Sequence, residues 1–184
     1  MCRNMIKTMR FILFLGALFF FSCSAPAQQG ITGLWKSRDQ NSDKPRSLVA
    51  IYEYEGKYYG RMLATYNDDG TINDTICEKK DNAPGVVGNP PYCGMDFVYN
   101  LKQKEVNGEL IDKYRGKVID PEKGKVYNAE VWRQGEVLIF RGELWIFGKN
   151  IPWKKASISD LPKGFSMRDI KHFVPIVPKP CNPP

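Results

Sequence analysis

Apolar and polar residues alternate with a period of two through most of the chain between Ile31 and Ala156. Such a period places successive side chains on opposite faces of a β-strand. Residues 48–55 illustrate the two faces, with one set of Leu48, Ala50, Tyr52 and Tyr54 and a second set of Val49, Ile51, Glu53 and Glu55. The pattern therefore predicts an antiparallel sheet. Evidence for helix is thin: Met95–Val106 is the one sizeable stretch without Gly or Pro, and it fits a strand equally well.

Turn residues separate the alternating segments at short intervals. The clearest turn lies between Lys113–Ile119 and Lys125–Arg133, and we expect it at Asp120, Pro121 and Gly124. The proline ring fixes its own φ, and the glycine can adopt the left-handed conformation that closes a hairpin. Roughly seven or eight short strands separated in this way predict an all-β domain, a small antiparallel barrel or a sandwich.

Two segments fall outside the alternating pattern. Asn67–Tyr92 is rich in Asn, Asp, Gly and Pro, and a loop of this length is usually functional or disordered. Ser157–Pro184 ends in VPIVPKPCNPP, which favours extended polyproline geometry over packing. We therefore expect a barrel domain over residues 31–156, followed by a Pro-rich tail over 157–184. The tail holds the sole histidine, His172, which we expect to be solvated.

The N-terminus carries a targeting signal. Phe11–Phe21 is an unbroken apolar run that follows Arg3, Lys7 and Arg10. It is much shorter than the roughly 20 residues that a membrane-spanning helix needs, and it fits the apolar region of a secretory signal peptide. We therefore expect export to the periplasm or cell envelope.

Two cleavage sites compete for this signal peptide. Ala25-Pro26-Ala27 would end it at residue 27. Cys23 directly follows the apolar region, as does the cysteine of bacterial lipoproteins, and processing there would end the signal at residue 22 and lipidate the thiol. The mature domain would then be either soluble or anchored to a membrane by lipid alone.

Charge and composition exclude several classes of protein. The 184 residues carry a net charge of +7, but three of the basic residues lie in the signal peptide, which leaves +4 on the rest. This mild charge gives no reason to expect a nucleic-acid partner. A single histidine argues against a multi-histidine metal centre and against a Ser-His-Asp hydrolase. We expect no metal and no cofactor.

Three cysteines, Cys77, Cys93 and Cys181, remain after either cleavage. Disulfides form in the oxidising compartments that exported proteins enter. Cys77 and Cys93 flank a loop rich in Gly and Pro and are the expected pair, although none of the three need be bonded. Closing their loop of about sixteen residues would contribute about 3 kcal/mol in the chain-entropy model.

A series of short motifs is similar to one exported bacterial family. In chain order they are Gly33-Leu34-Trp35, Lys57-Tyr58-Tyr59-Gly60-Arg61, Asp81-Asn82-Ala83-Pro84, Cys93-Gly94-Met95, the block Gly116–Tyr127, Phe140-Arg141-Gly142, and Gly148-Lys149 with Pro152-Trp153-Lys154. They resemble the family known as domain of unknown function 2147, over about Ile31–Ala156. The chain departs from the family where Ala83 separates Asn82 from Pro84. The resemblance implies a small envelope β-protein without an assigned activity.

The resemblance also invites comparison with the calycins, the lipocalin-like barrels. Their Gly-x-Trp motif, here Gly33-Leu34-Trp35, closes one end of the barrel beneath a basic side chain from the last strand. This comparison implies that Trp35 plugs the barrel and that Arg141 or Lys154 covers its indole through a cation–π contact.

Aromatic residues supply the candidates for ligand binding. They either fill a solid barrel or line a largely apolar pocket with a few polar anchors. The candidate lining residues are Tyr52, Tyr54, Tyr58, Arg61, Tyr127, Trp132 and Trp145, with Arg133 as a further anchor. We therefore expect a non-catalytic protein that binds a small apolar or amphiphilic ligand.

Two other functions remain open from the sequence. A solid barrel would suit an interaction module, in which the long loop or the tail binds another envelope protein. A hydrolase of envelope sugars or lipids would need an inward acid with a raised pKa, for which Glu53, Glu130 and Glu143 are the candidates.

Overall fold

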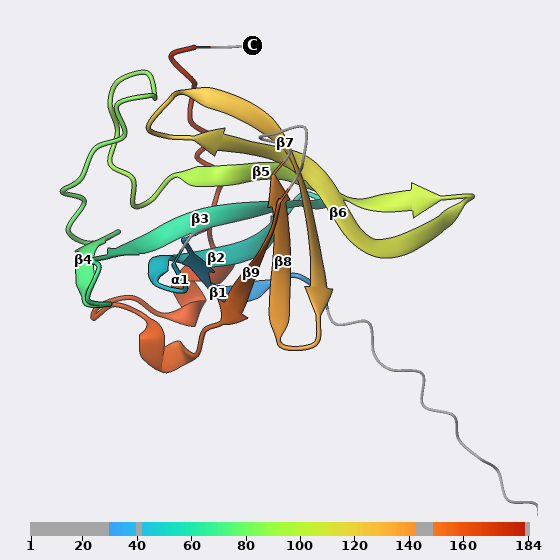
Figure 1. Ribbon diagram of the computed structural model, residues 1–184, viewed down its shortest axis with the longest axis horizontal. Helices are drawn as coiled ribbons and strands as arrows, with labels where there is room; N and C mark the ends of the chain where they lie inside the picture. The colour runs from blue at the N-terminus through green and yellow to red at the C-terminus, as the bar shows by residue number, and fades with distance from the viewer. Residues whose placement is uncertain (1–29, 40–41, 143–148, 183–184) are drawn as a thin grey trace, which may run out of the picture.

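The alternating segments form antiparallel strands in the computed structural model, which describes residues 30–39, 42–142 and 149–182 (Figure 1). The strands are β1 (Gly33–Arg38), β2 (Pro45–Tyr54), β3 (Lys57–Tyr66), β4 (Ile72–Thr75), β5 (Asp96–Val106), β6 (Glu109–Asp120), β7 (Lys125–Gln134), β8 (Val137–Gly142) and β9 (Lys149–Lys155). The all-β class predicted from the alternation is confirmed, and the ambiguous Met95–Val106 segment is a strand.

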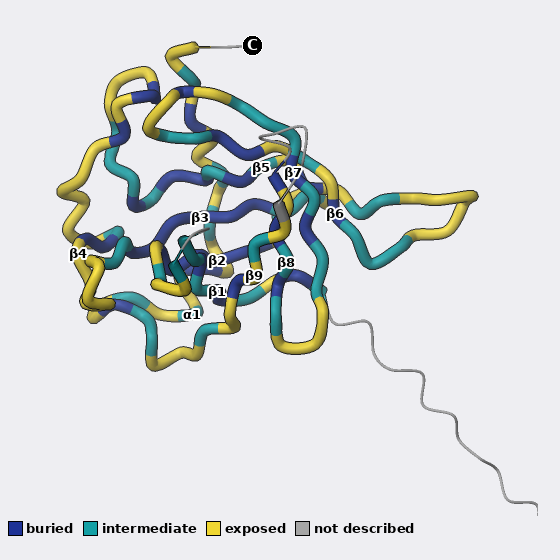
Figure 2. The backbone as a smooth tube through the Cα atoms, in the orientation of Figure 1, coloured by how far each residue is buried: buried dark blue, intermediate teal, exposed yellow. Residues whose placement is uncertain are grey.

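The strands close into a barrel. Neighbours follow the order β2-β1-β9-β8-β7-β6-β5-β3-β4, and a further pairing of β2 with β3 joins eight of these strands into a ring. The remaining strand, β4, pairs with the end of β3 outside the ring. The hairpin of β5 and β6 projects beyond the barrel, and its tip at residues 105–110 is exposed (Figures 1 and 2).

Apolar side chains from every strand of the ring meet inside the barrel. Their buried members are Ile31, Trp35, Val49, Ile51, Val98, Leu101, Tyr114, Val118, Ala129, Val131, Leu138, Phe140 and Trp153. β2, β6, β7 and β8 contribute residues an even number of positions apart, as a period of two requires. β5 contributes Val98 and Leu101, on either side of a register shift, and β3 contributes the partly buried Tyr58. The interior is therefore one continuous apolar cluster.

Trp35 fills the end of the barrel near the turn between β7 and β8. Its side chain is 1% exposed, and its indole Nε1–H donates to the Ile31 carbonyl at 3.0 Å. Gly33 precedes it with a φ of +136°, a conformation that side chains other than glycine's rarely adopt. The Gly-x-Trp spacing thus combines a backbone bend with a buried plug.

The basic side chain beside this plug is Arg133, and not Arg141 or Lys154 as expected. The Arg133 guanidinium carbon lies 5.6 Å from the Trp35 ring centroid, and Gly135 O accepts from its Nε at 2.7 Å. Arg141 and Lys154 are exposed. Each follows an inward-facing aromatic residue on its strand, so the alternation turns it outward.

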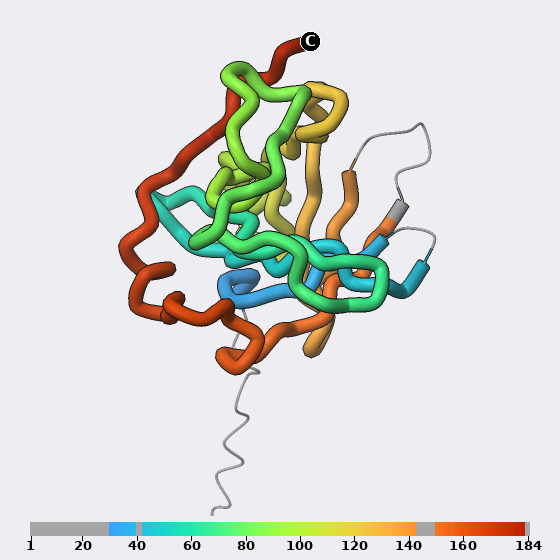
Figure 3. The backbone as a smooth tube through the Cα atoms, turned by 90° about the vertical axis from the view of Figure 1, so that its left-hand side faces the viewer, coloured from blue at the N-terminus to red at the C-terminus, as the bar shows by residue number. Residues whose placement is uncertain are grey.

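The C-terminal segment packs against the outside of the barrel. It contains a 3-10 helix η1 (Ile158–Asp160) and a helix α1 (Met167–Lys171). Its residues Leu161, Phe165, Met167, Ile170 and Phe173 contact a second apolar cluster on the outer faces of β1, β2 and β3. We call residues 157–182 the C-terminal strap (Figure 3). The strap is packed against the barrel, whereas the proline content predicted a free tail.

Among the described residues, no helix has the length and apolar character to cross a membrane.

A buried ion pair fastens the strap. Arg61 Nη2 lies 2.7 Å from Asp96 Oδ2, and it also donates to the Val174 carbonyl at 2.6 Å. The same carboxylate accepts from the Ile176 N–H at 2.5 Å, and its other oxygen accepts from the Tyr52 hydroxyl at 2.9 Å. Both charges thus find partners on the strap, which offsets the cost of removing them from water.

The turn between β6 and β7 forms at Asp120, Pro121 and Gly124. Asp120 Oδ1 accepts from the backbone N–H groups of Glu122 and Lys123 at 3.0 and 3.1 Å. Gly124 has a φ of +62°, and a Cβ there would lie 2.3 Å from the carbonyl oxygen of Gly85. Glycine is therefore required both by the turn and by the loop packed on it.

The predicted disulfide is absent: Cys77 and Cys93 are both free thiols in the structure. Cys77 is exposed on the loop after β4, whereas Cys93 is buried and donates to the Asp74 carbonyl at 3.6 Å. Burial, with the nearby Asp74 acting in the same direction, raises the pKa of the Cys93 thiol to about 12. The Cys93 side chain therefore acts as a small neutral core residue.

We predict that the cysteines differ in reactivity. Near neutral pH, iodoacetamide should modify Cys77 and Cys181 in the folded protein and leave Cys93 unmodified, because thiolate is the reactive form and Cys93 is buried and neutral. Mass spectrometry of the digested protein would identify the modified sites. Equal modification of Cys93 and Cys77 would contradict the burial, and protection of both until a reductant is added would show the disulfide instead.

We also predict that Trp35→Ala lowers the free energy of unfolding by about 3–5 kcal/mol, because it empties a fully buried site. Trp132 is a matched control, since it lies half-buried on the outer face against Lys113. Trp132→Ala should cost about 1 kcal/mol or less. Urea unfolding followed by circular dichroism measures both, and equal losses would contradict the plug.

Candidate functional site

A cavity of about 710 Å³ occupies the part of the barrel where β1, β3 and β6 end and β2, β5 and β7 begin. Its lining comes from these strands, from β4, β8 and β9, and from the loops that follow β1, β3, β4 and β6. The Trp35 side chain, which does not line it, lies in the interior cluster toward the other end of the barrel. The barrel is thus solid at one end and hollow at the other.

Aromatic side chains form the apolar wall of the cavity. The rings of Phe140 and Trp153 stack with their centroids 4.9 Å apart and their planes within 4°. Phe97 lies on another side of Trp153, with centroids 6.2 Å apart. Tyr127 and Ile151 pack against the same interior cluster and also line the cavity. This wall offers a flat apolar surface from β5, β7, β8 and β9.

Three hydroxyl side chains form a row across the opposite wall. Ser37 on β1, Ser47 on β2 and Thr65 on β3 are cross-strand neighbours in register, and all three line the cavity. The Ser37 and Ser47 Oγ atoms lie 2.5 Å apart, and Ser37 Oγ also accepts from the Ser47 N–H at 3.0 Å. The row places polar groups close to the mouth, at the ends of β1 and β3 and the start of β2.

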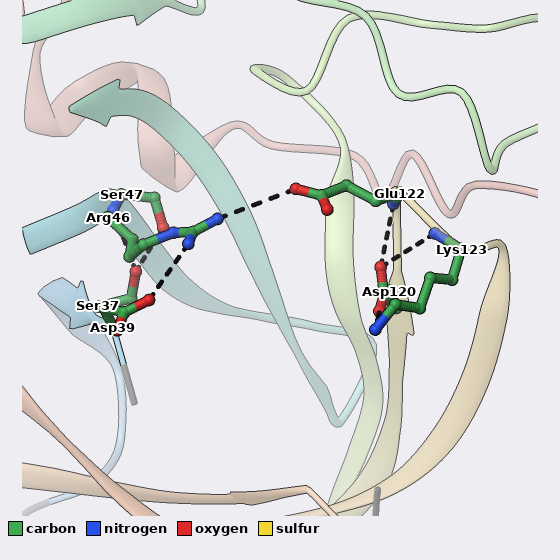
Figure 4. Close-up of polar contacts among 7 residues, drawn as sticks. All are labelled: Ser37, Asp39, Arg46, Ser47, Asp120, Glu122 and Lys123. Atoms are coloured by element: carbon green, nitrogen blue, oxygen red, sulfur yellow. Dashed lines mark hydrogen bonds and ion pairs between the residues drawn. The ribbon is translucent and has the colours of Figure 1, made fainter. Parts of the chain in front are cut away.

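Charged side chains surround the mouth of the cavity (Figure 4). Arg46 at the start of β2 donates to Asp39 Oδ2 at 3.2 Å, and its other terminal nitrogen lies 3.8 Å from Glu122 Oε1 in the β6–β7 turn. These pairs link opposite sides of the mouth. Arg46 and Glu122 are each 61% exposed, so their attraction is weak and sensitive to salt.

Two of the predicted lining residues lie inside the barrel. Tyr127 lines the cavity. Tyr58 lies deeper, where its ring packs edge-to-face on Tyr114 with centroids 4.9 Å apart. Burial raises the pKa of Tyr58 and raises that of Tyr114 to about 12, so both phenols are neutral. Tyr58 therefore belongs to the solid part of the barrel.

Four predicted lining residues face outward, and this corrects the sequence interpretation. Tyr52 and Tyr54 belong to the cluster beneath the strap, and Arg61 is part of the ion pair with Asp96. Trp132 lies on the outer surface, with the Lys113 Nζ 4.7 Å from its ring centroid. Because β2 and β3 are buried on both faces, their aromatic residues do not identify the inner one. The predicted residues Trp145 and Cys23 lie outside the described residues.

The acids proposed for hydrolysis do not gather at the cavity. Glu53 is exposed, and Glu130 is half-buried with Lys104 Nζ 3.7 Å away. Neither lines the cavity, and Glu143 lies outside the described residues. Sequence reasoning missed Ser37, Ser47, Thr65 and Arg38, because isolated serines and threonines carry no signal until the strand register brings them together.

Comparison with solved structures supports the barrel. The structure resembles that of protein HP1028 from Helicobacter pylori, which is described as belonging to the lipocalin family. The two share 23% sequence identity with a TM-score of 0.51, over 70% of this chain and 84% of that one. At this identity the likeness shows the fold, a lipocalin-like barrel. Comparison with curated proteins finds no match to this chain.

The match to a protein-family model covers the whole barrel. The family model DUF2147, described as an uncharacterised protein conserved in bacteria, matches residues 33–155. These residues begin with β1 and end with β9, and they include the Gly-x-Trp motif and the β6–β7 turn. The chain therefore belongs to the DUF2147 family, as the resemblance of its short motifs to that family predicted.

Proposed function

We propose that the barrel binds one small amphiphilic molecule in its cavity and does not convert it chemically. The observation that carries this proposal is the cavity of about 710 Å³, which is open to solvent at one end of the barrel. Small-molecule sites typically occupy about 300–1,000 Å³ and combine an apolar lining with a few polar groups. The aromatic wall and the hydroxyl row provide these two components on facing sides.

The apolar part of the ligand would contact Phe140, Trp153 and Phe97. Burying apolar surface contributes roughly 25 cal/mol per Å², before the cost of ordering the ligand is subtracted. The polar part would remain near the mouth, where charged side chains and water are available. An amphiphile therefore fits this cavity better than a fully apolar or fully polar molecule.

The alternatives from the sequence receive less support. The interaction module was expected to have a solid barrel, whereas this barrel contains a cavity. Hydrolysis by paired carboxylates needs two acids facing one cleft, and neither Glu53 nor Glu130 lines the cavity. HP1028 is described as a lipocalin-family protein, which agrees with a binding role for this barrel. Export remains a prediction from residues 1–27, and it would make envelope molecules the source of the ligand.

The proposal predicts that filling the cavity abolishes binding. Val118 faces the cavity from β6, so Val118→Trp should place its indole where the ligand lies. The fluorescence of N-phenylnaphthylamine, an uncharged apolar probe, should rise on addition of the native protein. The variant should bind it about tenfold or more weakly, since the apolar surface is no longer available.

Val87→Trp is the matched control, because Val87 is 57% exposed on a loop and does not line the cavity. It should bind the probe as the native protein does. Thermal unfolding of both variants would establish that they fold. Equal binding by the native protein and a folded Val118→Trp variant would place the probe elsewhere and contradict the proposal.

A further inference from the structure

We infer that the ligand of this cavity carries an anionic oxygen head group, a carboxylate or a phosphate ester, bound at Arg38 and the hydroxyl row. The inference rests on the proposed function and specifies its ligand class. It follows from the hydrogen-bonding capacity that the protein leaves unused inside the cavity. That capacity includes the Arg38 Nε–H, which can only donate, and hydroxyl groups, which can donate.

Arg38 supplies the charged donor. Its side chain lines the cavity at the end of β1 and is 13% exposed. Nη1 pairs with Asp43, whose carboxylate is 82% exposed and therefore well hydrated. Nε is buried and has no hydrogen-bond partner among the described residues. An arginine N–H can donate only, so its partner must be an acceptor.

Thr65 supplies a second unused group. The residue lines the same cavity wall, and its Oγ1 is buried without a hydrogen-bond partner within the described part of the chain. Ser37 and Ser47 supply a third. The two hydroxyls hold two protons, and the single bond between them uses one. One serine O–H therefore remains to donate to a ligand.

The carboxylates that line the mouth already have partners. Asp39 accepts from the Ser42 N–H and from Arg46, and Asp120 accepts from the backbone of its own turn. Glu122 pairs with Arg46, and Asp81 accepts from the Asn73 amide at 2.5 Å. Asp68 Oδ1 lies 4.0 Å from Lys44 Nζ. The negative charge of these acids is thus partly offset by Arg46, by Lys44 and by N–H donors.

These groups lie on neighbouring strands. Ser37, Ser47 and Thr65 are in register across β1, β2 and β3, and Arg38 follows Ser37 directly. A ligand oxygen would meet the Arg38 guanidinium and the Thr65 hydroxyl after rotation about their side-chain bonds. Hydrogen bonds between ionised groups are stronger than neutral ones, so an anionic head gains most. The apolar chain then extends along the Phe140 and Trp153 rings.

A set of twelve-carbon amphiphiles that differ only in the head group tests the inference. Dodecanoate and dodecyl phosphate are anionic, dodecanol is neutral, and dodecyltrimethylammonium is cationic. Each would compete with N-phenylnaphthylamine for the native protein. At least one anion should bind about tenfold to a hundredfold more tightly than dodecanol. The comparison between the two anions distinguishes a carboxylate from a phosphate.

Two variants connect this preference to the residues. Arg38→Met keeps the apolar stem and removes the charge, and Thr65→Val keeps the shape and removes the hydroxyl. Thr65→Val is expected to fold because its hydroxyl has no partner among the described residues. Each variant should weaken anion binding and leave dodecanol binding unchanged. Arg141→Met is the matched control, since Arg141 is exposed on β8 and does not line the cavity, and this variant should keep the native preference.

The outcomes separate the inference from the proposed function. Tighter anion binding that both folded variants reduce would support the head-group assignment. Equal binding of dodecanol and the anions, tighter binding of the cation, or an anion preference that persists in Thr65→Val and a folded Arg38→Met would overturn it and leave a ligand-binding barrel. No competition by any amphiphile, together with no probe binding, would overturn the proposed function as well.

Discussion

The pairing of β2 with β3 is the interaction on which the rest of the structure depends, because it closes the sheet into a barrel. A closed ring of eight strands has an interior wide enough for its own side chains or for one small ligand. Here both occur. Trp35, Tyr58 and Tyr114 fill one end, whereas small hydroxyl residues on β1, β2 and β3 leave space at the other. The size of the inward side chains thus determines where the cavity lies.

Closure also creates an outer surface that the chain covers with its own C-terminal strap. The strap packs on β1, β2 and β3 and is joined to them by the pair of Arg61 and Asp96. Replacing one member of such a pair would leave a buried charge without its partner, which would destabilise the packing of the strap on the barrel. The same packing buries Tyr52 outside the barrel, at a position that the alternation alone does not assign to either face.

The sequence was sufficient to predict the strands of the barrel, the turn at Asp120–Gly124 and the family, since these depend on local patterns and short motifs. It missed β4, which lies within the predicted loop Asn67–Tyr92. It was not sufficient to identify the inner wall. Arg133 covers Trp35 because the β7–β8 turn brings it there, and β8 and β9 turn Arg141 and Lys154 outward. Ser37, Ser47 and Thr65 form a row only through the register of three strands. Such relations between distant residues are fixed by tertiary pairing, which a single sequence does not display.

The most direct measurement of the central claim is a titration of the ¹⁵N-labelled protein with dodecanoate, followed through the tryptophan indole signals in nuclear magnetic resonance spectra. Trp153 lines the cavity, whereas Trp132 lies on the outer face. The account predicts a saturable shift of the Trp153 indole signal, with the Trp132 signal unchanged. A shift of Trp132 alone, or no shift of Trp153 at saturating ligand, would contradict a barrel that binds its ligand inside.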